Sequence, residues 1–301
     1  MGAQQRTTHK RRTMHIDHAR VHGHRIRYAV RAGDRTRPPL LLLNGLGANI
    51  ELAVPFIDAL DIPTVITFDV PGVGGSPTPP SPYRPSNIAR LTAELLDHLG
   101  HKEADVLGVS WGGAIAQQFA FQHRFQCRRL VLAATSPGAL MVPAQLPVLL
   151  KMITPRRYVD RDHALKVAGD VYGGAFRRDP AAVMHTFEHV RFSSRGGYYM
   201  QLAAAFGWTS LPWLWTLSQP TLIMAGADDP LVPLVNAYVM HWLIPDARIE
   251  ILDCGHLFLV TRAEESARIV ESFLTEPARS GARRRRGAAS REPSPSLRRM
   301  S

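Results

Sequence analysis

One serine in the chain stands where a nucleophile is expected. Residues 108–112 read Gly-Val-Ser-Trp-Gly, which matches the pattern G-x-S-x-G with Ser110 at its centre. The apolar run ADVLGV leads into the serine, and the small-residue run WGGAIAQQFA leads out of it. This order indicates a strand, a sharp turn and a helix, an arrangement that exposes the hydroxyl for covalent catalysis. A chance serine in an ordinary strand-to-helix turn is the alternative, and the order of the flanking elements disfavours it.

A serine hydroxyl needs a general base, and His256 is the best candidate for it. It follows the apolar run RIEILD in a turn that reads Asp-Cys-Gly-His, so it is expected on a loop above a sheet, within reach of Ser110. The other twelve histidines lie mostly in the N-terminal region or on helix faces. His98 and His123 are typical of them, and a surface or core role is expected there.

A carboxylate must hold the imidazole, and two adjacent aspartates compete for this role. Both lie in the segment Gly-Ala-Asp-Asp-Pro-Leu-Val-Pro at residues 226–233, after the apolar run TLIMAG. The acid then falls between the serine and the histidine in chain order, as expected when the serine occupies a G-x-S-x-G turn. Asp229 is preferred because it stands four residues before Pro233, and Asp228 is interpreted as a turn residue. Only geometry can decide between the two.

An oxyanion needs two N–H donors aimed at it, each worth roughly 3–4 kcal/mol in comparable enzymes. The predicted donors are the backbone N–H of Trp111, directly after the nucleophile, and that of Leu46 in the loop Asn-Gly-Leu-Gly. That loop lacks both common phosphate-binding patterns, so nucleotide binding is disfavoured. A second glycine-rich stretch at residues 71–76 runs into several prolines and is predicted to be a loop. No cysteine–histidine cluster has metal-ligand spacing, so neither a metal nor a cofactor is expected.

Six short apolar runs predict the strands that must position these groups. They occupy residues 40–44, 64–69, 104–109, 128–134, 221–226 and 248–253. Continuous apolar strands of this length are typical of a mostly parallel sheet with helices on both faces. Helical spacing predicts helices at 86–99, 111–121 and 263–274, and alternation predicts a hairpin at 19–30. The expected fold class is therefore α/β with right-handed crossovers.

The alternation of strands and helices stops at residues 138–218, which are rich in aromatic residues and carry two glycine pairs. This stretch is predicted to be an inserted, mostly helical cap (a lid) over the carboxyl ends of the strands. Most of its aromatic side chains are expected to form the cap's own core. Others are expected to line a substrate pocket together with the Trp111 side chain. The core domain is then formed by residues 14–137 and 219–276.

The net charge of +11 belongs to the ends of the chain. Residues 1–13 carry +4 and residues 277–301 carry +7, so the remainder is close to neutral. Both ends are predicted to be disordered basic tails, with weak attachment to an anionic surface as the alternative. No specific nucleic-acid binding is expected, and the sequence predicts no oligomeric state.

The distribution of apolar residues and the two cysteines predict the cellular compartment of the protein. No apolar run is long enough to span a bilayer and none follows the basic N-terminus, which predicts a cytoplasmic protein without a transmembrane segment. The two cysteines, Cys127 and Cys254, are expected to be free thiols, and one disulfide between them is the alternative.

Several motifs resemble those of one family, the intracellular medium-chain-length poly(3-hydroxyalkanoate) depolymerases of the α/β-hydrolase superfamily. The similar strings are NGLGAN, FDVPGVGGS, GVSWGGA, QQFA, GWTS, AGADDPLVP and GHLFLVTRAE. The resemblance extends over roughly residues 15–275 and includes the cap segments PRRYV and YGGAFRRDP. It is specific, because NGLGAN departs from the His-Gly start common in other α/β-hydrolases.

The resemblance implies a serine esterase that releases (R)-3-hydroxyacids or short oligomers from polymer granules, with the family's triad at Ser110, Asp229 and His256. From the residues alone, the prediction is an ester hydrolase with a large apolar cap that works through an acyl-enzyme. The polyester substrate and the storage granule come only from the resemblance. The first alternative is a small-molecule carboxylesterase, thioesterase or carbon–carbon bond hydrolase of the same fold. The second is a non-catalytic granule-associated protein, which an intact Ser–Asp–His set disfavours.

Overall fold

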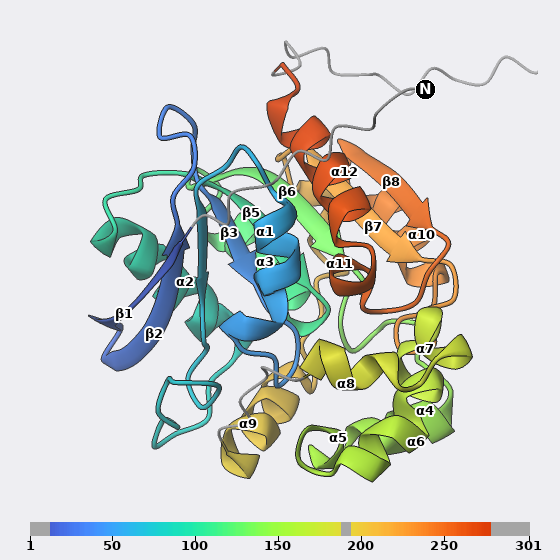
Figure 1. Ribbon diagram of the computed structural model, residues 1–301. Helices are drawn as coiled ribbons and strands as arrows, with labels where there is room; N and C mark the ends of the chain where they lie inside the picture. The colour runs from blue at the N-terminus through green and yellow to red at the C-terminus, as the bar shows by residue number, and fades with distance from the viewer. Residues whose placement is uncertain (1–12, 188–193, 278–301) are drawn as a thin grey trace, which may run out of the picture.

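A sheet of eight strands forms the centre of the computed structural model, which describes residues 13–187 and 194–277 (Figure 1). In chain order the strands are β1 (Met14–Val21), β2 (His24–Arg31), β3 (Leu40–Leu43), β4 (Val65–Phe68), β5 (Ala104–Val109), β6 (Cys127–Ala133), β7 (Thr221–Gly226) and β8 (Ala247–Leu252). Their order across the sheet is β1-β2-β4-β3-β5-β6-β7-β8. The strands from β4 to β8 run parallel, and β2 pairs antiparallel with both β1 and β4. The predicted fold class, α/β with a mostly parallel sheet, is confirmed.

The antiparallel edge is the predicted hairpin. Strands β1 and β2 pair along their whole length through a turn at His22 and Gly23, both with positive φ. A buried ion pair ties this edge to the centre, because Arg27 of β2 lies 3.0 Å from the carboxylate of Asp69, which follows β4. The same carboxylate accepts hydrogen bonds from the backbone of Ile50 and Gly75. It therefore holds the two loops that follow β3 and β4 in fixed positions.

Two layers of helices cover the sheet (Figure 1). One layer contains α2 (Pro85–His98), α3 (Trp111–Gln122) and α10 (Val235–Leu243), and the other contains α1 (Val54–Ala59), α11 (Phe258–Thr261) and α12 (Ala263–Thr275). Successive residues of a strand point to opposite faces. In β3, Leu41 faces the first layer and Leu42 the second, and both are buried. A near-continuous apolar strand is the direct consequence of this double burial.

Three of these helices, α1, α10 and the four-residue α11, are not among the elements predicted from the sequence. In α10 the apolar residues occur on every side: Met240 is buried, whereas Tyr238 and Trp242 are exposed. The helical period is therefore hidden, because exposed and buried positions have the same chemistry. Helix α1 has only six residues, too few to show a period.

The predicted cap region lies between β6 and β7 and contains α4 (Leu146–Met152), α5 (Arg156–Val159), α6 (Arg161–Tyr172), α7 (Ala175–Arg178), α8 (Ala182–Phe187), α9 (Arg195–Ala205) and the 3₁₀ helix η2 (Leu214–Thr216). Figure 1 shows α4 to α9 on one side of the sheet's end. The chain leaves and returns at one place, where Gly138 and Thr209 pair in an antiparallel bridge. Beyond it, Leu214 and Leu217 are buried in the core of the first helix layer. The described residues between these two bridge partners include α9, whose Ala204 also packs into the core of the first helix layer.

The ends and the cysteines complete the description of the chain. Apart from Thr13 and Pro277, the predicted basic tails lie outside the described residues. Cys127 and Cys254 are both buried and unbridged, as expected. Within the described part of the chain, no helix combines the length and apolarity that crossing a membrane would require.

Candidate active site

Ser110 lies at the sharp turn between β5 and α3, with φ +54° and ψ −117°. The flanking glycines are required by close contacts. A Cβ on Gly112 would lie 2.1 Å from the carbonyl oxygen of Leu43, and a Cβ on Gly108 would lie 2.4 Å from that of Gly112. The helix therefore begins directly against the strands β3 and β5. This packing is the physical reason for the G-x-S-x-G pattern.

His256 and Asp229 are brought into contact by the loops that follow β8 and β7. Nδ1 of His256 lies 2.7 Å from Oδ2 of Asp229, and both side chains are buried. The backbone N–H groups of Leu231 and Val232 donate to Oδ1 of Asp229, so the carboxylate is held on both oxygens. Because a carboxylate only accepts, Nδ1 carries the proton and Nε2 remains available to accept one.

Asp228 has a different environment from its neighbour. Its carboxylate pairs with Arg177 at 2.9 Å and accepts a hydrogen bond from the N–H of Gly174, near the molecular surface. Burial raises the pKa of Asp228, but the hydrogen bonds from Arg177 and Gly174 and the charge of Arg177 together outweigh burial and hold the pKa below its usual value. Of the two aspartates, the structure thus places Asp229 against the histidine, and Asp228 ties the cap region to the loop after β7.

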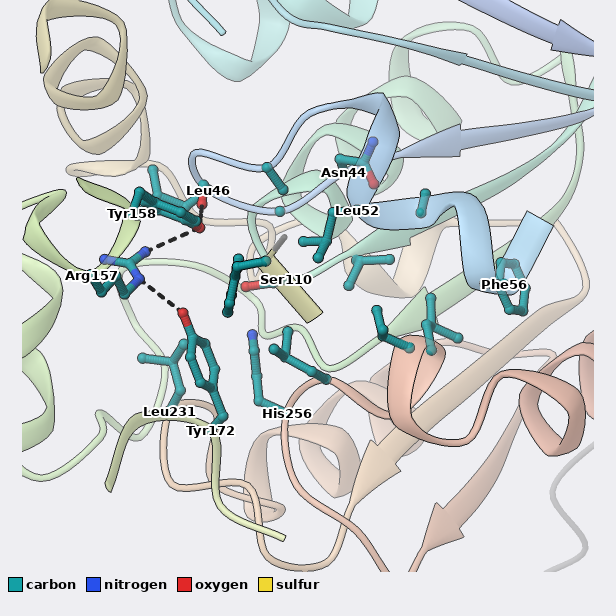
Figure 2. A pocket seen from close by; sticks show the side chains of 18 of the residues that line it. Asn44, Leu46, Leu52, Phe56, Ser110, Arg157, Tyr158, Tyr172, Leu231 and His256 are labelled. Atoms are coloured by element: carbon teal, nitrogen blue, oxygen red, sulfur yellow. Dashed lines mark hydrogen bonds between the residues drawn. The ribbon is translucent and has the colours of Figure 1, made fainter. Parts of the chain in front are cut away.

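Ser110 and His256 line the same pocket. Figure 2 shows the imidazole of His256 pointing toward the serine hydroxyl. The loop after β3 approaches from another side, since a Cβ on Gly45 would lie 3.5 Å from that of Ser110. The three segments that carry Ser110, His256 and Leu46 therefore meet at the carboxyl ends of the parallel strands, where open α/β sheets bind ligands.

The two predicted oxyanion donors lie on either side of this meeting point. Trp111 is the first residue of α3, so its N–H has no acceptor within the helix. Leu46 lines the pocket. The expectation that the Trp111 side chain forms a pocket wall is wrong, because its indole is buried in the core and donates a 3.0 Å hydrogen bond to the carbonyl oxygen of Gln201.

The pocket walls are mostly apolar and come from both parts of the chain. The sheet side supplies Leu42, Leu46, Leu52, Phe56, Leu231, Leu257, Leu259 and Val260 among others, and the cap region supplies Met152, Arg157, Tyr158, Tyr172 and Phe187. Some aromatic residues of the cap region thus line the pocket as expected, while others, such as Phe176, are buried in its own small core. Such a surface suits the alkyl part of a substrate.

Arg157 is the polar pocket residue that sequence reasoning missed. Only 4% of it is exposed, and its guanidinium donates to the hydroxyls of Tyr172 and Tyr198 at 3.0 and 2.8 Å. Burial raises the pKa of Tyr198 to about 12, so that hydroxyl stays protonated and donates to the carbonyl oxygen of Met152. No short motif marks these contacts, because Tyr172 and Tyr198 lie 15 and 41 positions away from Arg157.

The fold and the pocket define a class of protein, and comparison with known proteins agrees. The sequence matches the family described as "alpha/beta hydrolase fold" over residues 38–173 and 185–263, and the chain belongs to this family. It is 54% identical over 252 residues to the poly(3-hydroxyalkanoate) depolymerase of Ectopseudomonas oleovorans, and the aligned part covers 83% of this chain and 89% of that protein. The resemblance noted from the motifs is confirmed.

Other similar proteins are more distant. The 3-oxoadipate enol-lactonase 2 of Acinetobacter baylyi is 27% identical over 80% of this chain and 90% of its own length. Among solved structures, the enol-lactonase from Burkholderia xenovorans LB400 superimposes with a TM-score of 0.74 at 24% identity, covering 86% of this chain and 100% of that one. At this identity the likeness shows the shared fold alone.

Proposed function

We propose that this chain is a serine esterase that hydrolyses medium-chain-length poly(3-hydroxyalkanoate) to hydroxyacid monomers or oligomers. The observation that carries the proposal is the buried pair of Asp229 and His256, which faces Ser110 in one apolar pocket. The 54% identity to a depolymerase supports a polyester as the substrate.

The first half of the reaction forms an acyl-enzyme. Ser110 Oγ attacks the ester carbonyl carbon while Nε2 of His256 takes the hydroxyl proton, and Asp229 stabilises the resulting imidazolium through Nδ1–H. The carbonyl oxygen becomes an oxyanion that accepts hydrogen bonds from the N–H groups of Leu46 and Trp111. When the tetrahedral intermediate collapses, His256 returns its proton to the departing hydroxyl end of the polymer.

The second half releases the acyl group. A water molecule loses a proton to His256 and attacks the acyl carbon, and the proton then returns to Ser110 Oγ. Overall, one water is consumed and one ester bond is cleaved, giving a carboxylic acid from the acyl group and a hydroxyl end on the released chain. The apolar walls contributed by Leu52, Phe56 and Phe187 hold the alkyl side chain of the hydroxyacid.

Residues 139–208 act as the lid of this site. They supply Met152, Tyr158 and Tyr172 to the pocket wall, while both ends of the segment are held together at the bridge between Gly138 and Thr209. Further contacts seat the lid on the core, among them the ion pair of Arg177 with Asp228 and the hydrogen bond from Tyr158 to the carbonyl oxygen of Leu46. The remaining residues from 14 to 276 form the α/β core.

Activity on polymer and on a soluble ester separates the proposal from its nearest alternative. Wild-type protein and the variant Ser110→Ala are assayed on a medium-chain polyester latex and on p-nitrophenyl octanoate. We expect wild-type turnover of both substrates and none by the folded variant. Turnover of the soluble ester alone indicates a small-molecule esterase. Wild-type rates in the variant contradict the role of Ser110, and failure of a fluorophosphonate probe to label the wild-type protein contradicts serine catalysis altogether.

The site of action follows from the substrate. A hydrolase for a stored polyester works in the cytoplasm at the surface of the polymer granule. The basic segment 277–301 is a candidate for granule attachment, because its charge of +7 attracts anionic surfaces. Deletion of this segment should weaken granule binding at low salt, and unchanged binding across a salt series would show that the segment has no such role.

A further inference from the structure

The lid contacts the loop that carries one proposed oxyanion donor. The peptide unit between Leu46 and Gly47 is held at both of its polar atoms by lid side chains. The hydroxyl of Tyr158 in α5 donates to its carbonyl oxygen at 2.7 Å, and Oε1 of Gln201 in α9 accepts from its N–H at 2.8 Å. This peptide unit directly follows the one whose N–H is the proposed donor of Leu46.

The Tyr158 hydroxyl donates to the carbonyl oxygen of Leu46, which can only accept, and itself accepts from Arg157. Nη2 of Arg157 lies 3.4 Å from the Tyr158 hydroxyl, and a guanidinium has no acceptor atom, so it donates to the Tyr158 oxygen. Figure 2 shows the chain of contacts from Arg157 through Tyr158 to Leu46.

Gln201 joins both halves of the proposed oxyanion hole. Its side chain holds the N–H of Gly47, and its own carbonyl oxygen accepts the indole N–H of Trp111 at 3.0 Å. Gln201 is completely buried, and within the described residues its Nε2 has no hydrogen-bond partner. Burying an amide N–H without a partner costs free energy. The hydrogen bond that Oε1 accepts from Gly47 therefore explains why a polar residue is buried at position 201.

Close packing leaves the loop little freedom. Gly47 has a φ of +72°, and a Cβ at this position would lie 2.8 Å from Cε2 of Tyr158 and 3.1 Å from Cδ2 of Tyr198. A glycine is therefore required both by the backbone conformation and by the two tyrosine rings. The loop and the lid helices form one packed unit.

We infer that Tyr158 and Gln201 are positioning residues that set the geometry of the oxyanion hole from the lid. The inference rests on the proposed acyl-enzyme mechanism. Neither side chain touches the reacting atoms. Both act through the peptide of Leu46 and Gly47, and Gln201 also acts through Trp111. Stabilisation of the transition state is thus coupled to closure of the lid, because α5 and α9 must be seated for the two donors to be aimed.

The test compares binding of a transition-state mimic with turnover of an ester. The variants Tyr158→Phe and Gln201→Met each remove one of the two contacts while keeping the size of the side chain. Inhibition by octyl trifluoromethyl ketone reports on the oxyanion hole, because addition of Ser110 Oγ to its carbonyl carbon leaves an oxyanion. In each variant we expect the inhibition constant to rise and kcat on p-nitrophenyl octanoate to fall, both by about 10- to 100-fold. This effect is smaller than the ~10²–10³-fold loss of kcat that follows removal of a direct oxyanion donor. KM should change much less.

Two controls separate positioning from general destabilisation. Gln201→Glu keeps an acceptor for the N–H of Gly47 and should restore part of kcat. Gln219→Met removes another buried glutamine, which lies just before β7 and donates to the carbonyl oxygens of Ala120 and Arg124 at the C-terminal end of α3. This variant should lower the melting temperature without changing the inhibition constant. Wild-type inhibition and kcat in both lid variants would overturn the inference. A wild-type protein that neither turns over the ester nor binds the ketone would instead overturn the proposed function.

Discussion

The hydroxyl of Thr135 donates a 2.7 Å hydrogen bond to the carbonyl oxygen of Ser110, although 25 residues separate the two in the sequence. The N–H of Ser110 in turn donates to the carbonyl oxygen of Ala133 at 2.9 Å. Both contacts come from the end of β6, the strand beside β5. Together they hold Ser110 at a positive φ that residues with a side chain rarely adopt. The strained turn is thus maintained by the neighbouring strand.

This strain predicts a difference between two inactive variants. Ser110→Gly should be more stable than Ser110→Ala by about 1–2 kcal/mol, because glycine adopts a positive φ without steric cost. Neither variant should retain more than a trace of esterase activity. Urea unfolding of both proteins measures the difference, and equal unfolding free energies would show that the turn is unstrained.

Asp228 and Asp229 are adjacent, so the same substitution at each position tests which of them is the acid of the triad. Asp229→Asn should lower kcat by about 10³–10⁴-fold, because an amide cannot hold His256 in the required tautomer or stabilise its charged form. Asp228→Asn alters only the contacts with Arg177 and Gly174 and should leave kcat within about threefold of wild type. Steady-state rates on p-nitrophenyl octanoate decide the assignment. A larger loss in the Asp228 variant would reverse it.

Asp105, at the start of β5 and far from the catalytic end of that strand, should make stability depend on pH. Burial raises its pKa from 3.8 to about 6, and the ion pair with Arg128 offsets only part of this effect. The folded state therefore binds the proton more tightly than the unfolded state, so the contribution of Asp105 to stability falls as the pH rises from about 4 to about 6.

The variant Asp105→Asn removes this dependence. Relative to the variant, the wild-type protein should lose on the order of 3 kcal/mol of unfolding free energy between pH 4 and pH 7. Chemical denaturation of both proteins at several pH values measures the difference. Parallel curves for the two proteins would contradict the raised pKa.

The two thiols should be inert in the folded protein. Burial raises the pKa of Cys254 to about 12 and that of Cys127 still further, so neither forms an appreciable amount of thiolate at pH 8. A thiol-reactive disulfide reagent should leave both residues unmodified in the native state and modify both after unfolding. Rapid modification of Cys254 in the native protein, with loss of activity, would show that the loop before His256 opens readily.

Local patterns determined a large part of this protein. The runs that became β3 to β7 are mostly apolar because both faces of these strands are buried, so they are visible without any tertiary information. The G-x-S-x-G turn was equally visible, since its glycines are needed where β5 and α3 come too close for a side chain. The chain order of serine, acid and histidine followed from where each motif stands relative to a strand.

What the sequence alone determined is therefore the fold class, the nucleophile turn and the short set of residues from which a site can be built. Only the tertiary structure placed Asp229, rather than Asp228, against His256, buried the Trp111 indole in the core, and joined Leu46 to Tyr158 of α5. Periodicity and short motifs report on neighbours within a few residues. These three contacts span 27, 90 and 112 positions, and their partners are chosen by how the packed strands and helices face one another.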